Sequence, residues 1–354
     1  MNWRKELLPS ILPLDEGAML EAQRRLDSLT KPKHSLGRLE DFAKKAAGIT
    51  GNPRPCIKNK VIFTMAGDHG VAGEGVSLFP QEVTGQMIYN FLEGGAGVNV
   101  LARHAGARVV IADIGCIENI KTGNVNFIDK KIARGTGNIA GGPAMSEEQA
   151  IASLRAGMEI FEGEYARGRI DIAGLGEMGI ANTTSASAIT CCITGAKAED
   201  VTGRGTGIDD QRLKLKTDVV KKAVRVNNPD PHDPLDVLKK LGGFEIGALA
   251  GVIIAGAAKR VPVVIDGFIT ASAALIAAQI SPLSRDYLFA SHDSVEKGHA
   301  VALKWMGLAP MFDLQMRLGE GTGACIGISL IEAGTRVLNE MATFDGAGIS
   351  REKE

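Results

Sequence analysis

The chain has 354 residues, of which 45% are hydrophobic and 23% are charged, so it can bury a large core and has room for about two domains. Its 40 basic and 41 acidic residues give a formal net charge of -1, which favours neither a nucleic acid nor a membrane surface as a partner. Because no stretch approaches the roughly 20 apolar residues of a membrane span or resembles a signal peptide, we expect a cytoplasmic protein.

Two helices are predicted within residues 15–49, where apolar side chains recur at helical spacing. The segment TKPKHS separates them, because Pro32 disfavours a helical conformation at Lys31. Ser35 is the expected N-cap of the second helix, since its hydroxyl can accept a hydrogen bond from a free backbone N–H group.

From residue 60 onwards, short apolar and β-branched runs alternate with longer, alanine-rich helical stretches. Strands that alternate with helices form parallel βαβ units, and continuous apolar runs predict a sheet that is covered on both faces. The sequence therefore predicts an α/β fold with a parallel sheet flanked by helices. The clearest strand candidates are KVIFTMAGDHG, RVVIADIG, RIDIAGLGE, VPVVIDGF and YLFASHDS.

Each of these five strands is followed by polar or glycine residues. In an open parallel sheet the ligand crevice lies outside the carboxyl ends of the strands, so we expect the five endings to converge on one site. The polar residues at these ends are Asp68-His69, Asp113, Glu177, Asp266 and Ser291-His292-Asp293.

The chain returns to helical patterning in residues 296–343, chiefly in EKGHAVALKWMGL and CIGISLIEAGTRVLNEM. Because helical segments flank a single βα core, we expect the two ends of the chain to pack together as a smaller lobe. The predicted domains are a large nucleotide- and base-binding α/β domain over 60–295 and a small helical domain built from 1–59 and 296–354.

The stretch GLGEMGIANTTSA, residues 174–186, spaces three glycines as in a dinucleotide-binding turn. An NAD-dependent oxidoreductase is therefore one hypothesis, with Glu199 or Asp200 as the ribose ligand. Against this hypothesis, Glu177 lies between the second and third glycines, where its carboxylate would face the pyrophosphate of the dinucleotide. Two like charges about 4 Å apart repel by roughly 1 kcal/mol in water and several times more near a protein surface. A carboxylate followed by the hydroxyl-rich helix start 182–185 better suits a ligand with a cationic group and a phosphate.

Two further glycine-alternating loops support a phosphorylated ligand. GRGTG, residues 203–207, precedes a helix that carries Lys214 and Lys216, and RLGEGTGA, residues 317–324, places Glu320 between two glycines. Small residues let main-chain N–H groups approach an oxyanion closely, and a nearby lysine adds positive charge. The P-loop and the G-x-S-x-G elbow are both missing from the sequence, which argues against an NTPase and the commonest serine hydrolases.

The histidines and cysteines predict neither a metal site nor a redox motif. The six histidines contain no close pair at metal-ligand spacing, so we expect them to be hydrogen-bonded structural residues. The five cysteines contain no C-x-x-C pair and most lie in apolar runs, which predicts reduced thiols buried in the core.

Several segments resemble the nicotinate-nucleotide:dimethylbenzimidazole phosphoribosyltransferase family. They cover most of residues 25–345 in the expected order. Ala181 stands where the family more often has glycine, and Lys33-His34 replaces the usual proline-glycine. The matching segments are LTKPKHSLGRLE, AGDHGVAGEGVSLFPQEVTGQM, FLEGGAGVNVLAR, GTGNIAGGPAMSEEQA, LGEMGIANTTSASA, GRGTGIDD, SHDSVEKGHAVAL and RLGEGTGACI.

This resemblance implies a Rossmann-like parallel sheet with a small helical lobe, a homodimer, and transfer of phosphoribose from nicotinate mononucleotide to dimethylbenzimidazole. The product would serve cobalamin synthesis, and the reaction needs no metal or cofactor. The aromatic acceptor stays open between dimethylbenzimidazole, another benzimidazole, a purine and a phenol. A non-catalytic module that binds a nucleotide or an aromatic base is a third hypothesis, beside the transferase and the oxidoreductase.

The resemblance also assigns roles to particular residues. Glu320 is implied as the catalytic base and Glu177 as a second active-site carboxylate, while Ser77 and Gln86 would line the base pocket. Lys216 and Ser294 would contact phosphate or ribose. The other expected substrate-binding residues come from the glycine loops and the helix start: Gly176, Asn182, Thr183, Gly203 and Gly205.

Overall fold

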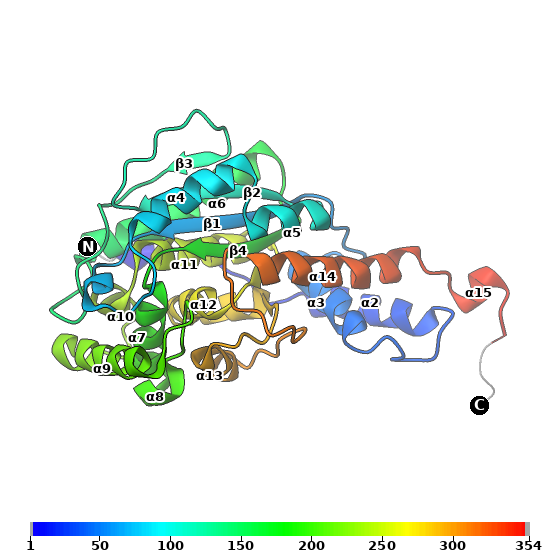
Figure 1. Ribbon diagram of the computed structural model, residues 1–354. Coiled ribbons are helices and arrows are strands. Elements are labelled where there is room, and N and C mark those ends of the chain that lie inside the picture. Colours follow the sequence, from blue (N-terminus) through cyan, green and yellow to red (C-terminus); the bar gives the residue numbers. More distant parts are fainter. Residues whose placement is uncertain (1–2, 351–354) are drawn as a thin grey trace.

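The computed structural model describes residues 3–350 and contains a six-stranded sheet in which every pair of neighbouring strands is parallel (Figure 1). The strand order is β3-β2-β1-β4-β5-β6. The predicted α/β class and parallel sheet are thus confirmed. The strands are β1 (Lys60–Gly67), β2 (Arg108–Gly115), β3 (Phe127–Asp129), β4 (Ile172–Met178), β5 (Val263–Ile265) and β6 (Leu288–Ala290).

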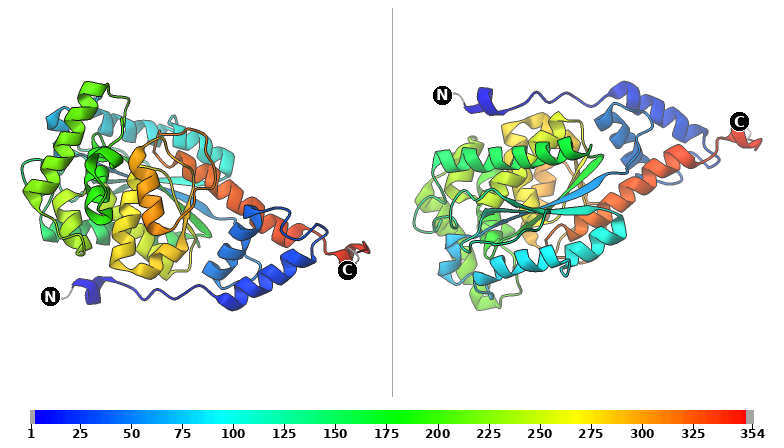
Figure 2. Two further views of the ribbon diagram at one scale, coloured as in Figure 1. Left: turned by 90° about the horizontal axis from the view of Figure 1, so that it is seen from below. Right: turned by 90° about the horizontal axis from the view of Figure 1, so that it is seen from above.

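Helices cover both faces of the sheet, as the continuous apolar runs of the strands predict (Figure 2). On one face α11 and α12 contact the strands and α6 packs against α11, while α4, α5 and α14 lie on the other face. The α-helices among the described residues are α1 (Trp3–Leu7), α2 (Glu16–Ser28), α3 (Arg38–Thr50), α4 (Glu82–Glu93), α5 (Gly97–Ala105), α6 (Glu147–Arg167), α7 (Asn182–Thr194), α8 (Ala198–Val201), α9 (Asp210–Asn227), α10 (Pro234–Leu241), α11 (Phe244–Ala258), α12 (Phe268–Ile280), α13 (Lys297–Met306), α14 (Thr322–Glu340) and α15 (Phe344–Ala347).

The five predicted strands are all present, and the sheet has one strand more. The additional strand, β3, pairs with β2 at the sheet edge over three residues only, 127–129. Its side chains are half-buried or exposed, so this segment lacks the continuous apolar run that identifies the other strands.

The two predicted N-terminal helices are present as α2 and α3, but the expected cap is wrong. Helix α3 begins at Arg38, and Gly37 with φ 53° occupies its N-cap position. Glu40 reaches back to satisfy the turn: its Oε1 atom accepts hydrogen bonds from the Leu36 N–H group at 3.0 Å and from the buried Lys31 ammonium at 2.8 Å. The carboxylate of Glu40 therefore holds the turn before α3, and no side chain caps the helix itself.

Segments from the two ends of the chain share a small core beside the sheet domain (Figure 2). It consists of six buried apolar residues from α2, α3, the segment after α2 and the end of α14. Helix α13 lies elsewhere, packed against α12, α7 and α8. The residues of the small core are Ala22, Leu26, Leu29, Ala43, Ala47 and Leu338.

The cysteines are all free, as the sequence predicts. Cys116 and Cys325 are buried, but Cys56 is exposed, so the expectation of core thiols does not hold for that residue. Within residues 3–350, no helix combines the length and the apolar character that crossing a bilayer requires.

Two non-glycine residues near the starts of helices have left-handed backbone. Ala181 has φ 73° directly before α7, and His34 has φ 60° in the loop before α3. Glycine adopts this conformation without the steric penalty that a β-carbon brings.

We therefore expect Ala181→Gly to raise the free energy of unfolding. Left-handed backbone costs an L-residue about 1–2 kcal/mol, and the greater entropy of glycine in the unfolded chain offsets about 0.5–1 kcal/mol of the gain. Urea unfolding should thus show a stabilisation of roughly 0.5–1 kcal/mol. The matched control is Ala152→Gly, at a half-buried helical position of α6, which should destabilise by about 1 kcal/mol. Similar losses for both variants would contradict the prediction.

Candidate active site

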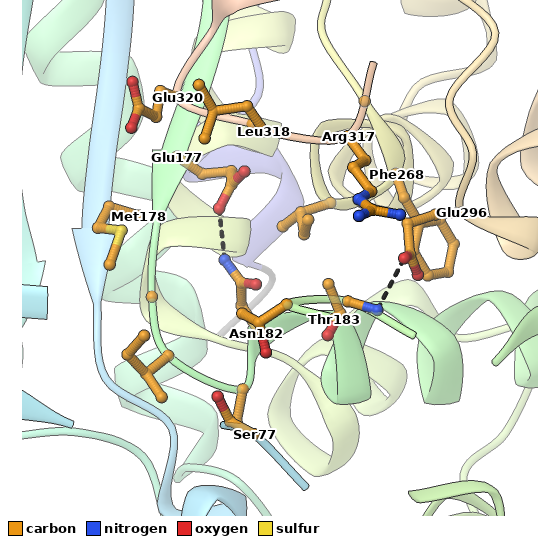
Figure 3. A pocket seen from close by; sticks show the side chains of 18 of the residues that line it. Ser77, Glu177, Met178, Asn182, Thr183, Phe268, Glu296, Arg317, Leu318 and Glu320 are labelled. Carbon is orange, nitrogen blue, oxygen red and sulfur yellow. Dashed lines mark hydrogen bonds between the residues drawn. The ribbon is translucent and has the colours of Figure 1, made fainter. Parts of the chain in front are cut away.

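A cavity of about 590 Å³ opens at the carboxyl ends of β4, β5 and β6 (Figure 3). Its position agrees with the rule for open parallel sheets. Seven of the predicted site residues line it: Ser77, Glu177, Asn182, Thr183, Gly205, Ser294 and Glu320. The remaining four, Gln86, Gly176, Gly203 and Lys216, do not line it.

The endings of β1 and β2 do not reach this cavity, so the expected convergence of five strand ends is only partly right. Asp113 accepts a hydrogen bond from the Cys116 N–H group at 2.8 Å, and Asp68 accepts one from Ile117 N–H at 2.8 Å. His69 is fully buried between Glu245 at 2.6 Å and Ser185 at 3.0 Å. These polar side chains form hydrogen bonds within the protein and do not line the cavity.

Glu177 comes from the end of β4 and is only 6% exposed. Burial, together with the nearby Asp266 carboxylate, raises its pKa to about 8, although the Asn182 amide donates a hydrogen bond to it and opposes this shift. Gly319 makes room for the side chain, because a β-carbon there would lie 2.4 Å from Glu177 Oε1. A cationic group bound beside this carboxyl group would favour its ionised form and so lower the raised pKa.

Glu320 sits in the loop before α14 and is also 6% exposed. Its Oε2 atom accepts a hydrogen bond from the Val98 N–H group at 3.0 Å, at the start of α5. Burial raises the pKa of Glu320, while the amides of Val98 and Gly97 partly counteract that effect. No sequence motif identifies these amide donors, although the glycines of FLEGGAGVNV allow the close approach: a β-carbon on Gly97 would lie 3.2 Å from Glu320 Oε2.

The backbone of Glu320 is left-handed, with φ 66°, and is fixed by its surroundings. Its carbonyl oxygen accepts a hydrogen bond from Thr64 of β1 at 2.9 Å. The residues that follow Glu320 are held by the buried Asp266 carboxylate, which accepts hydrogen bonds from the N–H groups of Gly321, Gly323 and Ala324 at 2.6–3.1 Å. Asp266 therefore caps α14 and holds the loop that carries Glu320.

The second glycine of GLGEMG, Gly176, packs against this loop. Gly174 and Gly176 lie inside β4, and a β-carbon on Gly176 would lie only 2.0 Å from the Glu320 carbonyl oxygen. In a dinucleotide-binding turn the glycines follow the strand and present their N–H groups to a pyrophosphate. Here two of the three are strand residues, which explains the spacing without NAD.

The lysine of the predicted phosphate region is buried beside the cavity. Lys216 is 1% exposed, and its ammonium donates hydrogen bonds to Thr183 Oγ1 at 2.7 Å and to the Gly203 carbonyl oxygen at 3.2 Å. Burial lowers the pKa of Lys216 to about 8, against the opposing charge of Glu296. Glu296, which sequence reasoning missed, also accepts the hydrogen bond of the Gly205 N–H group at 2.8 Å, so this amide is already occupied (Figure 3).

Much of the remaining lining of the cavity is apolar. Ser77 lines the cavity, whereas Gln86 is exposed on α4 and does not line it. Arg317 extends its guanidinium into the opening from the loop before α14 (Figure 3). The apolar lining was not predicted, since its members come from four separate segments: Val76, Phe79, Val83, Met87, Met178, Ile180, Phe268, Ile269 and Leu318.

The raised pKa of Glu177 predicts a pH-dependent gain in stability for Glu177→Gln in the protein without ligand. The folded state keeps a proton that the unfolded state loses above about pH 4.5, so the wild-type free energy of unfolding falls as the pH rises from about 4.5 to about 8. Glutamine stays neutral, and the melting temperature of the variant relative to wild type should therefore increase across this range. Glu162→Gln, an exposed change on α6, is the control. Parallel pH curves for Glu177→Gln and wild type would refute the assignment.

Fold and site together define an α/β protein with a ligand cavity at the carboxyl edge of its parallel sheet: two buried carboxylates line the cavity, and a buried lysine lies beside it. A family model described as phosphoribosyltransferase matches residues 11–349. The chain belongs to this phosphoribosyltransferase family.

Individual relatives give the same result over the full length. The chain is 55% identical to nicotinate-nucleotide–dimethylbenzimidazole phosphoribosyltransferase of Desulforudis audaxviator, covering 100% of this chain and 99% of the relative. It is 53% identical to the protein of that name from Geobacter sulfurreducens, covering 99% of each chain. The crystal structure of such an enzyme from Thermus thermophilus matches with a TM-score of 0.90 at 39% identity, over 96% of this chain and 100% of that one.

Proposed function

We propose that this protein transfers the phosphoribosyl group of nicotinate mononucleotide to dimethylbenzimidazole, giving nicotinate and α-ribazole 5'-phosphate for cobalamin synthesis. The observation that carries the proposal is the meeting at one cavity of two buried carboxylates, Glu177 from the end of β4 and Glu320 from the loop before α14. The names of the full-length relatives support the choice of both substrates.

In this reaction Glu320 is the base. The benzimidazole nitrogen forms a bond to the anomeric carbon of ribose as the bond from that carbon to the pyridinium nitrogen breaks, and the N–H proton of benzimidazole passes to the Glu320 carboxylate. Nicotinate leaves from a cationic ring, so cleavage neutralises the ring and needs no general acid. Burial supports the role of Glu320, because it raises the proton affinity of the carboxylate.

Glu177 stabilises positive charge. The pyridinium of the bound substrate and the oxocarbenium-like ribose of the transition state are both cationic, and either one favours the ionised form of a neighbouring carboxylate. Attack opposite the departing β-linked pyridine gives the α configuration of the product. The Asn182 hydrogen bond keeps the Glu177 side chain in place during this step.

The phosphate is assigned to the end of the cavity lined by Thr183 and Ser294, with Lys216 buried directly beside it. The Lys216 ammonium has three protons, and two of them are used by Thr183 and the Gly203 carbonyl oxygen. Gly203 thus acts through the lysine rather than through its own amide. The N–H group of Gly205 is already bound to Glu296, so Gly205 lines the cavity without donating this hydrogen bond to the phosphate.

The test is an assay of nicotinate release with nicotinate mononucleotide and a panel of acceptors: dimethylbenzimidazole, benzimidazole, adenine and phenol. Release that requires an acceptor, with the coupled nucleotide detected by mass spectrometry, is the expected result. The acceptor with the highest kcat/KM identifies the physiological class of base. Tight binding without release for every acceptor would instead indicate a binding module.

We also propose that the protein is a cytoplasmic homodimer. Phe79 and Leu318 line the cavity yet are 52% and 62% exposed, which suits a surface that a second chain covers. The five free cysteines suit a reducing compartment. Light scattering should give twice the monomer mass.

The proposed division into a large α/β domain and a small helical domain rests on the separate core of α2, α3 and α14. Helix α13 contacts α12 and α7 of the large domain. We propose the division as a large domain over 60–295 and a small helical domain from 1–59 and 296–354.

A further inference from the structure

His292 lies in the cavity wall and has no role in the reaction as derived so far. It follows β6, is 2% exposed and lines the cavity. Its ring stacks on Phe312, with centroids 5.9 Å apart and an interplanar angle of 23°, and contacts the ring of His299 at 5.9 Å. Packing therefore fixes the orientation of the imidazole.

The hydrogen bonds of Ser291 determine which ring nitrogen of His292 carries the proton. The Ser291 hydroxyl donates to the Asp266 carbonyl oxygen at 2.9 Å, and a carbonyl oxygen can only accept. A hydroxyl has one proton, so in the 3.0 Å contact between Ser291 Oγ and His292 Nδ1 the nitrogen must be the donor. The Asp266 carboxylate, 3.9 Å from Nδ1, favours a proton at the same atom.

The other ring nitrogen is consequently an acceptor. Burial lowers the pKa of His292, which keeps the ring neutral with a lone pair on Nε2. Among residues 3–350 none donates a hydrogen bond to this atom. Since His292 lines the cavity, this lone pair is free to accept a hydrogen bond from a bound ligand.

Nε2 points toward the cavity surface next to the phosphate end. A β-carbon placed on Gly267 would lie 3.8 Å from His292 Nε2 and 4.0 Å from Ser294 Oγ, and all three residues line the cavity. The absence of a side chain at Gly267 therefore leaves space in front of both polar atoms. A ligand group bound there lies beside the contact proposed for phosphate at Ser294.

We propose that His292 Nε2 accepts a hydrogen bond from a ribose hydroxyl of the phosphoribosyl substrate. The assignment rests on the proposed function, since it takes nicotinate mononucleotide as the ligand. At neutral pH the phosphate dianion, the carboxylate and the pyridinium ring of that molecule carry no N–H or O–H donor. Its 2'- and 3'-hydroxyl groups are the only hydrogen-bond donors available to the lone pair of His292 Nε2. His292 is thus a substrate-binding residue that contacts the ribose.

The test combines three proteins with three ligands and measures dissociation constants by calorimetry, which does not require turnover. The proteins are wild type, His292→Asn and His292→Gln, and the ligands are nicotinate mononucleotide and its 2'-deoxy and 3'-deoxy analogues. Asparagine keeps an amide N–H group close to the Nδ1 position but has no atom at Nε2. Glutamine is longer, so its amide oxygen reaches the Nε2 position. Thermal unfolding of each variant verifies that it is folded.

Wild type should bind one of the two deoxy analogues about ten-fold more weakly than the parent nucleotide. His292→Asn should bind the parent about ten-fold more weakly and should no longer distinguish that analogue, whereas His292→Gln should recover part of the loss. The analogue that shows this coupling identifies the hydroxyl.

The assignment would be overturned if the loss of affinity caused by each substitution simply added to the loss caused by removing either hydroxyl group. So would coupling to the acceptor instead of the ribose, seen as a His292→Asn effect on kcat/KM that disappears when 1-methylbenzimidazole, which has no N–H group, replaces benzimidazole. Wild-type turnover in the nicotinate-release assay is a separate readout, so an error in the reaction is distinguished from an error at His292.

Discussion

Replacing Glu320 by glutamine is expected to lower kcat by a factor of about 100 to 10,000. Glutamine has nearly the same shape, and its amide oxygen can still accept the hydrogen bond of the Val98 N–H group. It cannot take the proton of the benzimidazole nitrogen, however, and the loss should therefore appear in kcat more than in the KM of nicotinate mononucleotide. Initial rates of nicotinate release at saturating substrate measure it, with an unchanged melting temperature as evidence of folding.

A series of acceptors makes this test specific for proton transfer. A benzimidazole with an electron-withdrawing substituent has a more acidic N–H group and depends less on a base, so the penalty of Glu320→Gln should shrink along the series. Glu162→Gln, on the exposed face of α6, controls for the substitution itself. A penalty that is equal for every acceptor would assign Glu320 a purely electrostatic role, and an unchanged kcat would place the base elsewhere.

The second large effect is expected for Gly176→Ala, although this residue does not line the cavity. The added methyl group would lie 2.0 Å from the carbonyl oxygen and 2.4 Å from the carbonyl carbon of Glu320, so backbone atoms must move. Overpacking of this kind costs about 1–3 kcal/mol of stability. Because a displacement of about 1 Å at a reacting group reduces turnover by roughly 100-fold, kcat should fall as well.

Gly163→Ala on α6 is the matched control. Gly163 is exposed within the helix, and a β-carbon there would meet no atom within 4 Å. Alanine is the better helix former, and this variant should therefore be up to about 1 kcal/mol more stable with unchanged turnover. Chemical unfolding and initial rates on both variants decide the matter: wild-type stability and activity in Gly176→Ala would mean that the Glu320 loop is not confined by β4.

The sequence predicts the sheet well where a strand carries a long apolar run. Residues 60–67 and 108–115 each form an eight-residue strand, largely buried, and both were identified by composition alone. The edge strand 127–129 was missed because three half-buried or exposed residues carry no periodic signal. The N-cap of α3 was assigned wrongly because Gly37, which has no side chain to accept a hydrogen bond, occupies that position.

For the site, glycine spacing and strand endings located Glu177 and Glu320, but not what surrounds them. The partners of Glu320 depend on the register of β1 beside β4 and on the approach of α5, and both are tertiary features. Glycine loops likewise show where an amide is accessible but not which group occupies it. The N–H group of Gly205 binds Glu296, a residue 91 positions further along the chain.

Helix α14 connects the loop that carries Glu320 with the small core at the ends of the chain. It starts directly behind Glu320, packs on β4 and ends in the small core at Leu338. A helix of 19 residues is about 28 Å long, and a tilt of about 2° about its far end displaces its start by about 1 Å. A small change in the packing around Leu338, roughly the length of the helix away, would therefore shift the loop that carries Glu320. Engineering of this enzyme for a new acceptor therefore has two places to work: the residues that line the cavity, and the small core in which the far end of α14 is packed.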